Sequence, residues 1–187
     1  MIPALAVPRP RAALAGATLA LLLAAAHFQV AHAAGFDEEF DDDTKPWQEI
    51  AVQLPAPPAA ENLLPFEVSA TATQSFAIDA KSVTVGADGV VRYTLVTTSP
   101  AGARNVSYEG IRCATFERKL YAFGHADGSW SRSRRDQWER IVRNAANRQQ
   151  AVLAKDYFCE NLTVAGNAQQ MVERIRYQRS LSDMPGQ

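Results

Sequence analysis

Two spacings of apolar residues divide this chain and limit what it can fold into. Between Phe66 and Ser99, apolar and polar residues alternate with a period of two, which is typical of half-buried β-strands. The turn residues Ala87–Gly89 and the β-branched run Val90–Thr98 favour a tight antiparallel hairpin. Another strand is expected over Thr115–Phe123. This part of the chain therefore predicts an antiparallel sheet.

The C-terminal third carries apolar residues at three- and four-residue steps, as amphipathic helices do. One helix is expected to begin at Ser133–Asp136, which has the pattern of a capping box, and to run through Leu153. A second is expected over about Asn167–Arg179, with Met171 and its apolar neighbours facing inward. The two patterns together predict an α+β fold, an antiparallel sheet with two C-terminal helices packed on one face.

The N-terminus has the pattern of a secretory signal peptide over residues 1–33. Arg9 and Arg11 precede the apolar run Ala12–Ala26, and Ala31 and Ala33 supply small residues before a cleavage site. The run is shorter than the roughly 20 residues that span a bilayer, so cleavage after Ala33 is favoured over an uncleaved anchor. We expect export to the periplasm or cell envelope and no transmembrane segment after cleavage.

Cys113 and Cys159 are the only two cysteines, and both lie in the exported part. An oxidising compartment favours one intramolecular disulfide, which would tie the exit of the first helix to the chain before the Thr115 strand. Closing a loop from position 113 to 159 should stabilise the fold by up to about 4 kcal/mol. A reactive thiol is the alternative, although neither cysteine lies in a Cys-x-x-Cys pair.

Residues 34–65 are predicted to form an acidic and Pro-rich flexible arm before a single domain over 66–187. Asp37–Asp43 holds six carboxylates, which favours a solvated segment, and a calcium site is the alternative although the EF-hand spacing is absent. The four prolines of Pro55–Pro65 indicate a stiff connector or a strap across the domain, or else a ligand for a partner groove. Trp47 and Ile50 offer apolar contacts that would pin the arm.

No pattern of a known catalytic site is present. Cleavage would leave His125 as the single histidine, which excludes a histidine-rich metal site. The chain also lacks a Gly-x-Ser-x-Gly elbow, a phosphate loop and a dinucleotide fingerprint. His125 lies in a Gly-His-Ala-Asp-Gly turn, and a triad with Asp127 and a serine is the alternative. We therefore predict a protein that is not an enzyme and has no cofactor and no metal ion. A formal net charge of −1 argues against a nucleic-acid partner.

Arginines gather around the first predicted helix, with Trp130 and Trp138 nearby. They are Arg132, Arg134, Arg135, Arg140, Arg143 and Arg148. Basic and aromatic groups together can bind polyanions or stack on sugar rings. The alternative is a solvated helix with internal ion pairs, since Asp136 and Glu139 each precede an arginine by four residues. Residues 34–68 carry nine acids and one lysine, so a further hypothesis is that the acidic arm covers the arginines.

Several strings resemble the cryptic neisserial protein family of exported β-proteobacterial proteins. They are Asp88–Tyr93, Asn105–Cys113 and Asp156–Cys159, with Lys119, Tyr121-Ala122, Trp130 and Trp138 between them. The resemblance covers roughly Phe40–Arg179, and Tyr108–Cys113, read Tyr-Glu-Gly-Ile-Arg-Cys, is its most specific part. It implies a Gram-negative cell-envelope location. It implies no established biochemical activity and transfers no catalytic residue.

Within that string, Glu109 and Arg112 are predicted to form a buried or half-buried ion pair, and the alternative is a binding patch with Tyr108. The candidate binding residues are Tyr108, Glu109, Arg112, Trp130, Arg140 and Arg143. We expect a non-enzymatic structural or interaction module of the cell envelope whose partner is another envelope protein. The second hypothesis is a binder of an anionic polymer or glycan through the arginine-rich helix.

Overall fold

The computed structural model describes residues 46–142 and 147–183, and in these ranges it is mostly β-sheet with some helix. The strands are β1 (Leu63–Phe66), β2 (Ser75–Asp79), β3 (Thr84–Val85), β4 (Val90–Thr98), β5 (Arg104–Arg112), β6 (Glu117–Gly124), β7 (Trp130–Arg132), β8 (Glu139–Arg140), β9 (Cys159–Glu160) and β10 (Thr163–Val164). The helices are α1 (Arg148–Val152), which continues as a π-helical segment over Leu153–Phe158, and α2 (Ala168–Arg176). No helix in the described ranges is long and apolar enough to cross a membrane.

The main sheet is antiparallel and runs in the order β1-β2-β4-β5-β6-β7. Two short strands pair with interior strands of this sheet: β3 pairs with the start of β4, and β8 pairs with the start of β6. The predicted hairpin is confirmed, with Gly89 at φ 72° in the turn between β3 and β4. The central strand β5 had no prediction, because Ser107 and Glu109 put polar groups where a regular strand would carry apolar ones.

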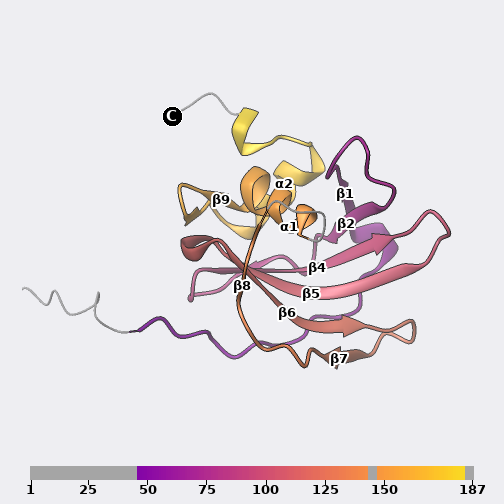
Figure 1. The fold of residues 1–187 in the computed structure, drawn as a ribbon, viewed down its shortest axis with the longest axis horizontal. Coiled ribbons are helices and arrows are strands. Elements are labelled where there is room, and N and C mark those ends of the chain that lie inside the picture. Colours follow the sequence, from indigo (N-terminus) through magenta and orange to yellow (C-terminus); the bar gives the residue numbers. More distant parts are fainter. Residues whose placement is uncertain (1–45, 143–146, 184–187) are drawn as a thin grey trace, which may run out of the picture. The chain divides into compact units, whose positions relative to one another are not determined.

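The helices cover one face of this sheet, which confirms the predicted arrangement (Figure 1). Tyr93 of β4 lies 5.3 Å from the ring of Phe158, and Ile111 of β5 joins the same buried cluster. On α2, Met171 and Ile175 are fully buried, as predicted. The helix α2 begins with a capping box between Asn167 and Gln170, which satisfies backbone N–H groups of its first turn.

The prediction of one long helix from Ser133 is wrong over Ser133–Val142. There the chain is largely extended: β8 pairs with β6, and the Ile141 N–H donates to the carbonyl of Phe116. The segment crosses from one face of the sheet to the other, so that Trp138 contacts aromatic rings on one face while Ile141 enters the core on the other. Apolar residues three or four positions apart, such as Trp138 and Ile141, therefore fit an extended segment that crosses between the two faces as well as they fit a helix.

The predicted disulfide is confirmed between Cys113 and Cys159. Cys113 opens the 3₁₀ turn after β5, and Cys159 begins β9 directly after the π-helical segment. The bond therefore joins the helical layer to the turn between the neighbouring strands β5 and β6. The β9–β10 hairpin places Val164 against the same core.

Residues Pro46–Pro58, which we call the strap, have no regular secondary structure and lie along the sheet face opposite the helices. Of the predicted alternatives for this segment, the contacts show a strap across the domain surface. Leu63–Pro65, also placed in the predicted arm, belong to β1. The predicted signal peptide, the acidic stretch Asp37–Asp43 and its hypothesised cover of the arginines lie outside the described residues.

Candidate functional site

The sheet face beneath the strap, which we call the outer face, carries charged and aromatic side chains. Neighbouring residues of a strand point to opposite faces, so Arg92 points outward while Tyr93 enters the core. A bulge in the β5–β6 pairing makes Tyr121 the extra residue of β6. The Tyr121 ring then lies over Gly110 of β5, where a Cβ atom would come within 2.6 Å of the Tyr121 hydroxyl. Gly110 is therefore the residue that lets Tyr121 cross β5 toward the strap.

Glu49 of the strap enters this face and joins its charges into a network. Its carboxylate accepts hydrogen bonds from Lys119 Nζ at 2.7 Å and from the Tyr121 hydroxyl at 2.5 Å, and it lies 3.5 Å from Arg92 Nη2. Lys119 has a second partner in Asp136, at 2.5 Å. Burial alone would lower the pKa of Lys119, but these two carboxylates raise it above its ordinary value. The pKa of Tyr121 is raised by burial and by Glu49.

Asp88, in the β3–β4 turn, anchors the other end of the network. Its carboxylate accepts two hydrogen bonds from Arg92, at 3.1 and 2.5 Å, and another from the backbone N–H of Ile50. Burial opposes ionisation of Asp88, but the hydrogen bonds from Arg92 and from the backbone outweigh it, so its pKa lies below the ordinary 3.8. The Asp88 carbonyl accepts the indole N–H of Trp47 at 2.8 Å, and the Trp47 ring lies 3.8 Å from the Arg112 guanidinium.

The predicted Glu109–Arg112 ion pair is wrong. The two residues are three apart on β5, so their side chains leave opposite faces of the sheet: Arg112 stacks on Trp47 while Glu109 is buried beneath the helices. The Glu109 carboxylate accepts hydrogen bonds from the hydroxyls of Tyr93 and Ser107 and from the amide of Gln150 of α1. Burial, followed by the charge of Glu109, raises the pKa of Tyr93 well above its ordinary value. Glu109 thus joins α1 to the sheet.

Tyr108 and Trp130 lie together on the outer face, in a cluster that also holds Tyr121. The ring centroids of Tyr108 and Trp130 are 6.2 Å apart, and the strap residues Val52 and Leu54 pack against the same cluster. The Trp130 indole N–H donates to the carbonyl of Pro55 at 2.9 Å. Of the predicted patch, the structure therefore brings Tyr108 close to Trp130, whereas Glu109 lies on the other face.

An open cavity of about 280 Å³ adjoins Trp130. Its walls come from the end of the strap, the start of β5 and the turn between β6 and β7. The lining residues are Pro57, Pro58, Arg104, Val106, Gly124, His125, Ala126, Gly128, Ser129 and Trp130. Arg104 and His125 are the titratable side chains in this lining, and no acidic residue belongs to it.

His125 lies in the predicted turn, closed by a hydrogen bond from the Gly128 N–H to the His125 carbonyl. Its Nε2 lies 2.6 Å from the hydroxyl of Ser131. The Asp127 carboxylate instead accepts from the backbone and hydroxyl of Ser129, and these two bonds lower its pKa below the ordinary value. The described contacts therefore do not form a Ser-His-Asp relay. In the described ranges no three His, Cys, Asp or Glu side chains are grouped to hold a metal ion.

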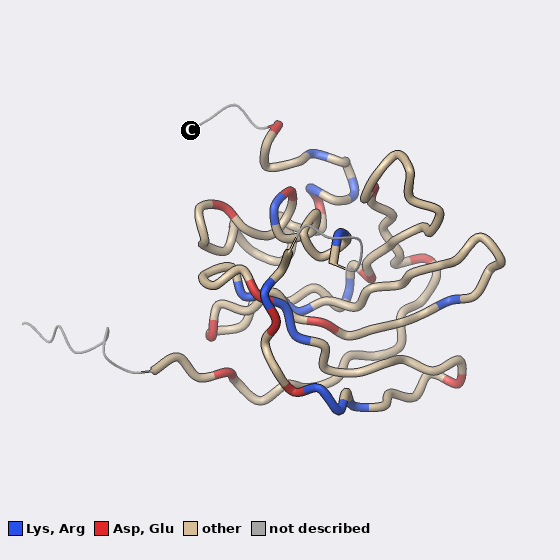
Figure 2. The backbone as a smooth tube through the Cα atoms, viewed as in Figure 1, with Lys and Arg blue, Asp and Glu red and all other residues tan. Residues whose placement is uncertain are grey.

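Of the six arginines assigned to the first helix, Arg148 begins α1, whereas Arg132, Arg134 and Arg135 lie at the end of β7 and on the extended run toward β8, among the blue segments of Figure 2. We call Arg132, Arg134 and Arg135 the arginine edge. All three are exposed, and within the described residues only Arg135 approaches a carboxylate, that of Glu139 at 3.9 Å. The predicted pairing of Asp136 with Arg140 is wrong, because Asp136 pairs with Lys119. Glu139 pairs with Arg118 at 2.9 Å, and its predicted partner Arg143 lies outside the described residues.

Two further predicted residues lie apart from this edge. Arg140 is exposed on β8, where its backbone pairs with Glu117 at the start of β6. Arg143 falls outside the described residues. A binding surface built from Arg140 and Trp130 together would have to span from β8 to β7, which join different parts of β6.

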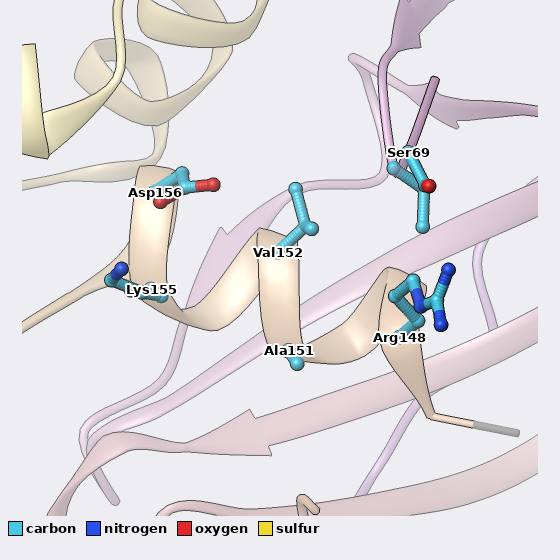
Figure 3. A pocket seen from close by; sticks show the side chains of 7 residues that line it. Ser69, Arg148, Ala151, Val152, Lys155 and Asp156 are labelled. Atoms are coloured by element: carbon cyan, nitrogen blue, oxygen red, sulfur yellow. The ribbon is translucent and has the colours of Figure 1, made fainter. Parts of the chain in front are cut away.

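A second hollow, of about 380 Å³, lies between α1 and the loop after β1 (Figure 3). Its floor is apolar, formed by Ala151 and Val152. Arg148 lies at one end and Lys155 at the other, with Asp156 beside Lys155. Because the charged groups do not converge on one point, this hollow is a weaker candidate than the cavity at Trp130.

Sequence reasoning missed the residues that organise the outer face, Glu49, Arg92, Lys119 and Tyr121, and it missed Arg104 of the cavity lining. A signal was present for two of them. Arg92 and Lys119 are cations inside strands that otherwise alternate, and such a residue points away from the core. No pattern marked Glu49, because its partners Lys119 and Tyr121 are 70 and 72 positions away.

The described residues thus form a disulfide-bonded α+β domain whose sheet is covered by helices on one face and crossed by a strap on the other. The chain belongs to the CNP1-like family, which matches residues 42–176. This match confirms the family resemblance carried by the Tyr108–Cys113 string. No curated protein and no solved structure matches the chain.

Proposed function

We propose that this protein is an exported, non-enzymatic interaction module of a Gram-negative cell envelope and that its arginine edge contacts an anionic envelope polymer. The observation that carries the proposal is a contrast between two sets of cations. On the outer face Arg92 and Lys119 each have two carboxylate partners. On the arginine edge, Arg132 and Arg134 have none among the described residues.

Unpaired exposed arginines leave positive potential on the surface, and such potential attracts polyanions. The strap strengthens this contrast, because its Glu49 pairs with the cations Arg92 and Lys119 of the outer face and with no arginine of the edge. A protein partner was the first hypothesis from the sequence. The free guanidinium groups favour a polyanion, since each offers a planar fork for carboxylate or phosphate oxygens.

The envelope location is supported by the signal-peptide pattern of residues 1–33. The disulfide Cys113–Cys159 is also in keeping with an oxidising compartment such as the periplasm.

Charge reversal of the edge tests the proposal. The mature protein, residues 34–187, would be titrated with polygalacturonate at low and at physiological salt, as wild type and as the triple variant R132E/R134E/R135E. A matched control, K81E/K155E/R176E, changes the same number of exposed cations on other elements. We expect the edge variant to lose about tenfold in affinity, since three exposed contacts of roughly 0.5 kcal/mol each amount to one decade. The control should bind as wild type does, and binding should weaken with salt.

Equal binding by the two triple variants, or binding that salt does not weaken, would overturn the polymer proposal. Cross-linking in the cell envelope with the same variants distinguishes a protein partner from an anionic polymer. A discrete protein adduct that survives charge reversal of the edge would make a protein the partner and contradict the polyanion assignment.

A further inference from the structure

We infer that the cavity beside Trp130 is a saccharide subsite for one sugar ring that bears a carboxylate. The inference rests on the proposed function and deepens it, because it names the unit of the polymer that the domain would recognise. Trp130 begins β7 and Arg132 ends it, so the cavity and the arginine edge lie on one strand. A polymer that follows the edge would place one of its units in the cavity.

The Trp130 ring is held in one orientation before any ligand arrives. Its indole N–H is bonded to the Pro55 carbonyl, and the Tyr108 ring packs against it at a steep angle. Gly124 of β6 lies close to the indole, where a Cβ atom would be 3.3 Å from Cζ3. A rigid aromatic wall that remains open to a cavity suits the apolar C–H face of a sugar ring, because no side-chain freedom is lost on stacking.

Another part of the cavity wall comes from the strap. Pro57 and Pro58 line the cavity, and the Gly128 turn approaches them so closely that a Cβ atom at Gly128 would lie 3.1 Å from Pro57. The cavity therefore exists only while the strap lies on the sheet. Its volume of about 280 Å³ falls just below the roughly 300–1,000 Å³ of sites that hold drug-sized ligands, which fits one pyranose ring rather than several.

The polar lining selects an acidic sugar. Arg104 is exposed and has no carboxylate partner among the described residues, so its guanidinium is available for a bidentate bond to a ligand carboxylate. His125 uses Nε2 toward Ser131, and its other ring nitrogen has no partner in the described part of the chain. Because His125 lines the cavity, we assign that nitrogen to a ring hydroxyl of the ligand. The lining itself holds no acidic residue, and the carboxylate of Asp127 in the same turn is occupied by the backbone N–H and hydroxyl of Ser129.

The test is a titration of the ¹⁵N-labelled mature protein with glucuronic acid, with glucose as the neutral control, followed by NMR at the Trp130 indole N–H. A ligand of this size, with the binding free energy per non-hydrogen atom that is typical of small molecules, should have a Kd of about 1 mM. We expect the Trp130 signal to shift with glucuronic acid in wild type. Arg104→Gln should weaken this binding about tenfold, because one charge-assisted pair is lost. The same change should leave any weak glucose binding unaltered.

Arg104 is exposed, so the variant is expected to fold, and K81Q serves as a charge-loss control elsewhere on the surface. Equal shifts with glucose and glucuronic acid, or full binding by Arg104→Gln, would overturn the inference. The edge variant R132E/R134E/R135E keeps the two proposals apart. If it loses polygalacturonate while wild type shows no Trp130 shift, the subsite is refuted and the proposed function stands. If the monosaccharide binds and the polymer does not, the proposed function fails and the cavity remains a sugar site.

Discussion

Replacing Glu49 by Gln tests whether one carboxylate holds the strap on the sheet. The change keeps the shape of the side chain and one acceptor oxygen but removes the charge. Lys119 then retains Asp136, and Arg92 retains Asp88, so neither cation is left without a partner. The cost should therefore fall short of the 3–5 kcal/mol typical of a buried ion pair broken on one side.

The magnitude follows from the two hydrogen bonds of Glu49, to Lys119 Nζ at 2.7 Å and to the Tyr121 hydroxyl at 2.5 Å. A hydrogen bond to a charged group contributes roughly 1 kcal/mol more than a neutral one. Two such bonds predict a loss of about 2 kcal/mol in the free energy of unfolding. For a domain of this size that loss corresponds to a fall of about 4–8 °C in Tm.

Urea unfolding followed by tryptophan fluorescence would measure this loss, and hydrogen exchange at the Trp47 indole and the Ile50 amide would show whether the strap opens first. Both groups donate to Asp88 when the strap is closed. Glu61→Gln, at an exposed carboxylate in the 3₁₀ turn that follows the strap, is the matched control and should stay within about 0.5 kcal/mol of wild type. If the Glu49 and Glu61 variants unfold alike and the two protons remain protected, Glu49 does not hold the strap.

Three further perturbations have expected outcomes. Reduction of the Cys113–Cys159 disulfide should remove about 4 kcal/mol of stability, since it releases a loop of 46 positions; an unchanged Tm in reductant would contradict this. The pKa of Asp88 in the folded protein lies below 3.8, so its carboxylate contributes its full stabilisation above about pH 4. That contribution is lost as the pH falls through the lowered pKa. Acid titration of Asp88→Asn should accordingly show a shallower loss of stability below about pH 4 than wild type does. Gly110→Ala should cost about 1–3 kcal/mol by displacing Tyr121, and a Tyr121→Phe background should reduce that cost because the nearest atom is the hydroxyl.

Local patterns in the chain predicted much of the fold. The β3–β4 turn with Gly89 at positive φ, the strands β4 and β6 and the helix α2 all follow from residue types within a few positions of one another. The disulfide followed from there being only two cysteines in a segment predicted to be exported. The family resemblance came from several short strings, of which Tyr108–Cys113 is the most specific.

The misses share a cause. The run from Ser133 to Val142 has helical spacing, but its backbone groups find partners on β6, and this competing ladder decides its conformation. For Glu109 and Arg112, proximity in the sequence suggested an ion pair, whereas the strand separates them onto opposite faces.

The sequence by itself determined the β3–β4 turn, the strands β4 and β6, the place of α2 and which cysteines pair, because those features depend on near neighbours or on simple counting. Only the tertiary structure decided that Glu49 contacts Lys119 and Tyr121 and that the strap and the turn between β6 and β7 line one cavity. It also decided that Arg132, Arg134 and Arg135 lie on an extended edge. These arrangements join residues that are tens of positions apart. The packing of the whole chain sets such contacts, and no local pattern of residues encodes them.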